Sequence, residues 1–156
     1  MTRRSAGVVL YRMAPHGLEV LLAHPGGPFW MKKDEGAWSI PKGEYGLDED
    51  ARMAARREFH EETGSMLSGE LMGLGDFKQP SGKIVTAFAA KGDFNPADLR
   101  SNICQIEWPP RSGQVIDIPE VDKVAWFDIE EAQKRIAKGQ QPIIDAFVKA
   151  IAECDE

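Results

Sequence analysis

The sequence "RREFHEETGS", residues 56–65, places three glutamates, Glu58, Glu61 and Glu62, within five consecutive positions. It ends a segment rich in helix-forming residues, and Gly64 suits the left-handed residue that often terminates a helix. At 100° per residue, Glu61 lies about 60° to one side of Glu58 and Glu62 about 40° to the other. The three carboxylates therefore share one face of the predicted helix.

The same face carries small residues. Ala54 and Ala55 fall within about 60° of Glu58 on the helical wheel, and small side chains let a helix pack closely on its neighbour. We therefore expect the glutamates to point inward or along the wall of a cleft. Two carboxylates about 6 Å apart repel by nearly 3 kcal/mol at an effective dielectric of about 20. A hard divalent cation with oxygen ligands would relieve that repulsion, which predicts a site for Mg²⁺, with Mn²⁺ as the alternative.

An exposed acidic helix is the competing interpretation. On a solvated helix, like charges one turn apart cost only tenths of a kcal/mol. Arginines of the same segment, Arg52, Arg56 and Arg57, could offset them. The helix alone leaves both interpretations open, and the spacing of residues around it has to decide.

The remaining segments predict more strands than helices. Apolar and β-branched runs separated by Gly and Pro indicate strands at 5–12, 18–24, 37–40, 69–79, 83–91, 103–108 and 121–127. Helical spacing indicates two C-terminal helices, 128–139, capped by Asp128 and stopped by Gly139, and 141–153. For the central helix we expect Asp48 to be the N-cap. This pattern favours an α+β fold in a single domain, residues 1–156.

The wider spacing resembles a known motif. Five residues separate Gly43 from Glu49, and seven more separate Glu49 from Arg57-Glu58-Phe59. One residue then precedes Glu61-Glu62, and one more precedes Gly64. This pattern resembles the Nudix box of the Nudix hydrolases. At background frequencies near 7% per residue type, the seven glycine, glutamate and arginine matches would arise by chance in roughly one chain of this length in a million.

One position of the motif differs from the family pattern. Ser65 stands where the family has an aliphatic residue, and Met66 and Leu67 follow it directly. We expect the apolar anchor to be shifted by one or two positions. The resemblance implies a Nudix-like αβα sandwich with a mixed β-sheet, in which the box forms a loop, a helix and a loop, followed by C-terminal helices.

The resemblance also implies site residues. Glu58, Glu61 and Glu62 match the metal-binding acids of the family, and the backbone carbonyl of Gly43 resembles a further metal ligand, although a simple turn is the other interpretation of this glycine. Arg57 matches the arginine that holds the loop and carboxylates in place.

The catalytic base varies within the family. Glu58 and Glu61 of the helix are candidates, and so is Glu120, which directly precedes the strand-like run 121–127. A solvated loop acid is the alternative interpretation of Glu120. Glu49, at the start of the box, is a supporting candidate beside the metal-binding acids.

Lys42, in "SIPKGEY", stands directly before the box glycine, as in family members that act on dinucleoside or diphosphoinositol polyphosphates. Its ammonium could contact a polyphosphate. Residues 25–36 read as a long surface loop in which Phe29 and Trp30 could stack on a nucleobase and Lys32 could contact phosphate. Alternatively, the two rings pack the loop down and the lysine is solvated.

The resemblance therefore implies metal-dependent hydrolysis of a pyrophosphate bond in a nucleoside diphosphate linked to another moiety, such as a dinucleoside polyphosphate or a nucleoside triphosphate. Pro80 matches a proline of ADP-ribose pyrophosphatases, whereas Tyr11 and Tyr45 lie upstream of the tyrosine position typical of dinucleoside polyphosphate hydrolases. The alternatives are an ADP-ribose or nucleotide-sugar pyrophosphatase and a non-catalytic nucleotide-binding regulatory module.

Composition limits the partners. The chain has 156 residues, is 42% hydrophobic and 28% charged, and carries a formal net charge of −6 without a block of Lys and Arg. This charge argues against binding to a nucleic-acid duplex or a membrane surface and favours a small-molecule partner. The chain has no long apolar run and no signal-peptide pattern, so we expect a cytoplasmic location. Cys104 and Cys154 read as free thiols, and a homodimer stays an alternative to a monomer.

Overall fold

The computed structural model describes residues 3–154. Its strands are β1 (Arg4–Ala14), β2 (Gly17–Pro25), β3 (Lys42–Glu44), β4 (Met72–Lys78), β5 (Ile84–Lys91), β6 (Ile103–Glu107), β7 (Val115–Pro119) and β8 (Val121–Asp128). Its helices are α1 (Ala51–Thr63), α2 (Ile129–Arg135) and α3 (Gln141–Cys154), with short 3-10 turns at Pro96–Asp98 and Lys138–Gln140.

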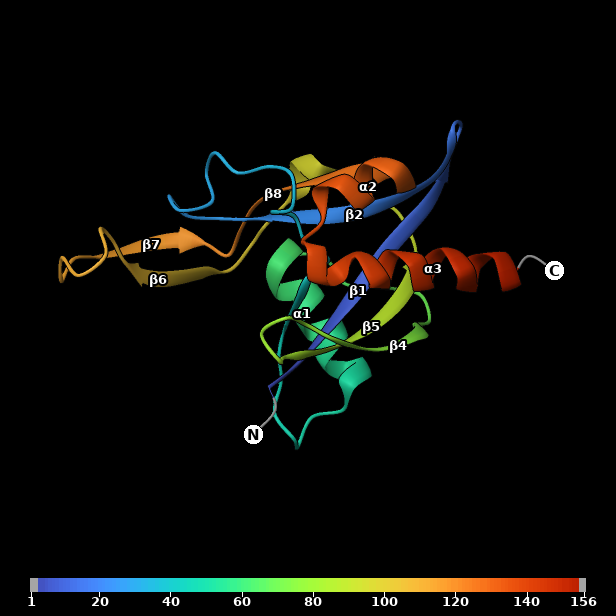
Figure 1. Ribbon diagram of the computed structural model, residues 1–156, viewed down its shortest axis with the longest axis horizontal. Helices are drawn as coiled ribbons and strands as arrows, with labels where there is room; N and C mark the ends of the chain where they lie inside the picture. The colour runs from blue at the N-terminus through green and yellow to red at the C-terminus, as the bar shows by residue number, and fades with distance from the viewer. Residues whose placement is uncertain (1–2, 155–156) are drawn as a thin grey trace.

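The main sheet is mixed. Its strand order is β4-β5-β1-β2-β8, with β3 paired to β1. β1 and β5 run parallel, with Arg4 opposite Ile84 and Tyr11 opposite Lys91, while the other pairs in this sheet are antiparallel. β6 and β7 form a separate two-stranded sheet that extends away from the body as a narrow arm (Figure 1).

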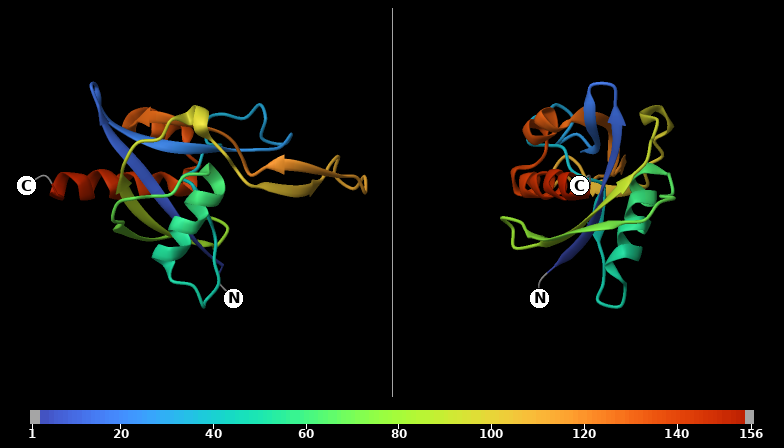
Figure 2. Two further views of the ribbon diagram at one scale, coloured as in Figure 1. Left: turned by 180° about the vertical axis from the view of Figure 1, so that it is seen from behind. Right: turned by 90° about the vertical axis from the view of Figure 1, so that its right-hand side faces the viewer.

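Helices cover both faces of the main sheet (Figure 2). Strand alternation creates two hydrophobic clusters: Val8 of β1 belongs to the cluster under α1, and Val9 belongs to the cluster under α2 and α3. Phe59 of α1 and Phe147 of α3 are the large buried side chains that each helix contributes. The expected αβα sandwich with a mixed sheet is therefore confirmed.

The caps of α1 differ in part from the prediction. Gly64 ends the helix in the left-handed region, at φ 82°, as expected. The N-cap is Asp50, whose backbone is extended and whose side chain accepts a hydrogen bond from the Met53 amide at 3.3 Å. The prediction of Asp48 as the cap was wrong, because Asp48 lies two residues upstream of the residue at which the backbone enters the helix.

The C-terminal helices keep their predicted order. Asp128 caps α2 as predicted, but this helix ends at Arg135 instead of Gly139. Ile136 has an extended backbone and forms a parallel bridge with Trp38, so the chain leaves the helix to pair with the loop before β3. α3 forms over Gln141–Cys154, one residue longer than predicted.

Two strand predictions need correction. The predicted strand at 37–40 reduces to isolated bridges at Trp38 and Ser39, and the strand that pairs with β1 forms at Lys42–Glu44. β7 was not predicted, because its alternating sequence "VIDIP" becomes a strand by pairing with β6 across a loop. Within residues 3–154, no helix has the length and apolar character needed to cross a membrane.

Asp50→Ala should lower the free energy of unfolding by about 1 kcal/mol, because it removes the side-chain acceptor at the start of α1. Asp48→Ala, two residues upstream, is the matched control and should change stability by less than about 0.5 kcal/mol. Urea unfolding followed by circular dichroism measures both. Equal losses in the two variants would contradict the assignment of Asp50 as the cap.

Candidate active site

Two of the three box glutamates point into the protein. Glu58 is 7% exposed and Glu62 is 9% exposed, whereas the side chain of Glu61 is 38% exposed. The face that carries Glu58 and Glu62 also carries Ala54 and Ala55, which are fully buried in the cluster under α1. Packing of the small residues therefore brings these two carboxylates inward. The competing interpretation, an exposed acidic helix, does not hold for Glu58 and Glu62.

Gly43 allows Glu58 to approach the sheet. A Cβ atom at position 43 would lie 1.9 Å from Oε2 of Glu58, so the carboxylate would have to move if this position carried a side chain. Gly43 lies in β3, which pairs with β1 through Ala6. The glycine therefore lets the carboxylate occupy the space that a side chain would take.

Arg57 connects three carboxylates. Its Nε and Nη2 donate to the two oxygens of Glu49 at 2.9 and 2.8 Å, and Nη1 donates to Glu58 at 2.8 Å and to Glu61 at 3.1 Å. The hydrogen bond from Arg57 lowers the pKa of Glu49. One guanidinium therefore orients Glu58 and Glu61 and fixes the loop that carries Glu49.

Negative charge exceeds positive charge around the buried glutamates. Glu62 accepts a hydrogen bond from the backbone amide of Lys42 at 3.3 Å. Burial, followed by the charge of Glu120, raises the pKa of Glu62 to about 8. Burial and then the charge of Glu61 raise the pKa of Glu58, against the opposing effect of Arg57. A cation in this region would stabilise the charged form of both glutamates.

A cleft of about 200 Å³ brings candidates from three segments together. It is lined by Ala23, Pro25, Ser39, Lys42, Glu62, Glu120 and Val121. Glu120, between β7 and β8, accepts a hydrogen bond from the Asn102 side chain at 3.2 Å. Lys42, Glu62 and Glu120 are thus neighbours, although the sequence separates Glu62 from Glu120 by 58 positions.

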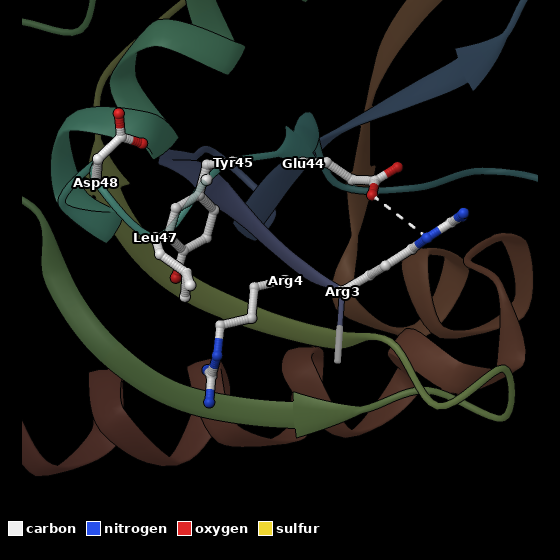
Figure 3. Close-up of a pocket in the computed structure, with 7 residues that line it drawn as sticks. Arg3, Arg4, Glu44, Tyr45, Leu47 and Asp48 are labelled. Carbon is white, nitrogen blue, oxygen red and sulfur yellow. Dashed lines mark ion pairs between the residues drawn. The ribbon is translucent and has the colours of Figure 1, made fainter. Parts of the chain in front are cut away.

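A larger cavity, of about 630 Å³, lies between the start of β1 and the loop after β3 (Figure 3). Its arginines are already paired: Arg3 lies 4.0 Å from Glu44, and Arg4 lies 3.6 Å from Asp76 of β4. It shares no lining residue with the 200 Å³ cleft. We therefore place the candidate active site at the smaller cleft, which the buried Glu62 lines together with Lys42 and Glu120.

The carboxylates suit a hard cation. Within residues 3–154, no group of three or more Asp, Glu, His or Cys side chains already converges as metal ligands would. Arg57 holds Glu58 and Glu61 in the present arrangement. Oxygen donors that carry excess negative charge are nevertheless the ligand type that Mg²⁺ and Mn²⁺ prefer, so the residues present fit a divalent ion.

The predicted substrate contacts in the β2–β3 loop, residues 26–41, lie apart from the cleft lining. Phe29 is 55% exposed and packs edge-to-face on Trp30, with ring centroids 5.0 Å apart. Lys33 places its ammonium 3.8 Å from the centre of the Phe29 ring, and Lys32 is exposed. The rings stabilise the loop and still present a free aromatic surface. The substrate roles of Phe29, Trp30 and Lys32 stay predictions.

Sequence reasoning did not single out His24. Its Nδ1 lies 2.8 Å from Oδ1 of Asp122, and its Nε2 lies 2.6 Å from the carbonyl oxygen of Lys33. The ring is buried and contacts Trp38 edge-on at 5.1 Å between centroids. A histidine at the end of the apolar run "LEVLLAH" was the available signal, but its partners are 9 and 98 positions away.

The comparisons with known proteins agree with this geometry. An 8-oxo-(d)GTP phosphatase from Mycolicibacterium smegmatis is 31% identical over 163 aligned residues, which cover 95% of this chain and 42% of that protein. The chain thus spans less than half the length of this curated relative.

Solved structures share the fold. A Caenorhabditis elegans Ap4A hydrolase in a binary complex has a TM-score of 0.69 and 24% identity, over 96% of this chain and 98% of that one. The NUDIX domain of Shewanella oneidensis NrtR in complex with ADP-ribose has a TM-score of 0.65 and 18% identity, over 97% and 89% of the two chains. The NUDIX domain family matches residues 1–147 of the sequence. The chain therefore belongs to the NUDIX family.

Proposed function

We propose that the protein is a metal-dependent hydrolase that cleaves a pyrophosphate bond in a nucleoside diphosphate linked to another moiety. The observation that carries this proposal is the pair of buried glutamates, Glu58 and Glu62, whose pKa values are raised by burial and by neighbouring acids, so that a cation would stabilise both carboxylates. They lie beside Lys42 and Glu120, which line the same cleft as Glu62. An acidic protein needs a cation to receive a substrate that is itself an anion.

The names of the relatives support a nucleotide substrate. They refer to 8-oxo-(d)GTP, to Ap4A and to ADP-ribose, each of which contains a nucleotide with phosphoanhydride bonds. These ligands differ in the group beyond the diphosphate. A dinucleoside polyphosphate or a nucleoside triphosphate suits Lys42, whose ammonium can contact additional phosphates.

Four groups would hold the metal ion, Mg²⁺ or Mn²⁺: the carboxylates of Glu58, Glu61 and Glu62 and the carbonyl of Gly43. A bound divalent ion neutralises charge on the pyrophosphate and activates water. Arg57 orients Glu58 and Glu61 through the hydrogen bonds from its Nη1. This orientation reduces the reorganisation needed when substrate binds.

The remaining residues act on the substrate and on water. Glu120 faces the cleft opposite Glu62 and can accept the proton of the attacking water, as can Glu58 or Glu61 of the helix. Lys42 can stabilise charge on the departing phosphate. Phe29 and Trp30 can stack on the base, with Lys32 near the phosphates.

Glu62→Gln should lower kcat by more than about 100-fold, which exceeds the usual effect of changing an outer-shell partner of a metal. The measurement is Mg²⁺-stimulated product release from a panel of 8-oxo-dGTP, Ap4A and ADP-ribose. Glu153→Gln, an exposed residue of α3, is the matched control and should retain wild-type rates. Full activity of Glu62→Gln, or nucleotide binding by the wild type without any turnover, would sink the hydrolase proposal, and the second outcome would favour a regulatory module.

Metal binding should also be visible without turnover. Mg²⁺ should raise the thermal midpoint of the wild type by several degrees, because the ion binds the folded state alone. In EDTA, Glu62→Gln should be at least as stable as the wild type, since it removes a carboxylate whose pKa is raised by burial and by Glu120, against the smaller opposing effect of Lys42. Its midpoint should then respond little to Mg²⁺. Differential scanning calorimetry measures each shift, and equal Mg²⁺ stabilisation of both proteins would exclude Glu62 from the metal site.

A further inference from the structure

The contacts of His24 constrain its protonation state. The ring is 1% exposed, so water cannot replace its protein partners. Both partners are acceptors: the carboxylate of Asp122 at 2.8 Å from Nδ1 and the carbonyl of Lys33 at 2.6 Å from Nε2. A neutral imidazole has one N–H donor and one acceptor nitrogen. Only a ring that carries hydrogens on both nitrogens can donate to both partners.

The carbonyl of Lys33 belongs to the β2–β3 loop. Pro25, the residue of β2 directly before this loop, and Ser39 of the loop itself line the cleft. The contacts of Lys33 continue to the aromatic pair: its amide donates to the carbonyl of Trp30 at 2.9 Å, and its ammonium lies over Phe29. A hydrogen bond to Lys33 therefore fixes the part of the loop that presents the rings.

The carboxylate of Asp122 lies next to the other wall of the cleft. Asp122 is in β8, two positions after Glu120. The pairing of β2 with β8 is irregular here: His24 lies opposite Lys123, whereas Pro25 lies opposite Val121, so Asp122 is the extra residue of a bulge. Bulges redirect side chains and are frequent near active sites. This bulge leaves Asp122 outside the regular pairing, with its carboxylate at His24.

We propose that His24 is a positioning residue whose doubly protonated ring ties the β2–β3 loop to β8 and thereby sets the loop's aromatic pair relative to the cleft. The expected effect of His24 on substrate binding rests on the proposed function. The hydrogen-bonded link between His24, Asp122 and Lys33 does not depend on the proposed function.

The first test observes the protein without substrate. In the wild type, ¹⁵N chemical shifts of the His24 ring should show hydrogens on both nitrogens, because both of its partners are acceptors. Hydrogen exchange measures the protection factors of amides 30–37, the part of the loop around Lys33. A ring with a hydrogen on one nitrogen alone would overturn the inference.

Asp122→Asn is the sharpest variant. Its amide can donate to Nδ1 of a neutral ring while Nε2–H donates to the Lys33 carbonyl, so both contacts survive without charge. Loop protection should therefore persist in this variant. Its loss would contradict the assigned hydrogen-bond roles.

His24→Phe removes both hydrogen bonds and keeps an aromatic ring beside Trp38. Protection of amides 30–37 should fall at least about tenfold at every pH, and KM should rise about tenfold, as expected for losing a base-stacking contact, with kcat within about threefold. His16→Gln, in the exposed β1–β2 turn, is the control and should change neither quantity. Unchanged loop protection in His24→Phe would refute the inference, whereas absence of turnover in the wild type would refute the proposed function alone.

Discussion

Burial of two glutamates on one face of α1 is the constraint on which the rest of the candidate site depends. Ala54 and Ala55 allow close packing of the helix, and this packing takes Glu58 and Glu62 out of water with it. A buried carboxylate must be paired, protonated or compensated by an ion. Arg57 compensates Glu58 in part. Glu62 accepts a hydrogen bond from the backbone amide of Lys42, and the charge of Lys42 favours its ionised form, but burial and the charge of Glu120 oppose that form more strongly. Buried acidic groups of this kind suit an ion-binding site, whereas they would be unfavourable in a purely structural core.

The two functions that a hydrolase needs are carried by different parts of the fold. The rigid part is the box, where β3 pairs with β1 and Arg57 joins the loop to the helix through Glu49 and Glu58. The adaptable part is the β2–β3 loop, which has little regular structure and is attached at separate points: Gly26 to the carbonyl of Glu120, and Lys33 to His24. Ion ligands gain from rigidity, whereas recognition of different nucleotides gains from a loop that can be altered without disturbing the sheet.

The parts of this structure that could be predicted from the sequence are those controlled by local periodicity. The acid face of α1, the stop at Gly64 and the helix at Gln141–Cys154 all follow from spacing along a few turns. The exact cap could not be distinguished in this way, because Asp48 and Asp50 are chemically equivalent and the choice depends on where the backbone enters the helix. β7 was not predicted because it is a strand only through its pairing with β6, which the local sequence does not indicate.

The parts of the site that the local sequence did not predict are positioned by contacts between distant segments. Glu120 was a candidate only through the family resemblance, and its approach to Glu62 depends on how β8 aligns with β2. In regular antiparallel pairing, a single register relates all residues of two strands, and neighbouring side chains alternate between faces. The bulge at Asp122 breaks this relation at the end of the sheet that borders the cleft, so that Asp122 reaches His24 while Glu120, two positions earlier, lines the cavity. Because of this one extra residue, the same end of β8 contributes to both the cleft and the loop beside it. In a regular strand, residues two positions apart would point to the same face.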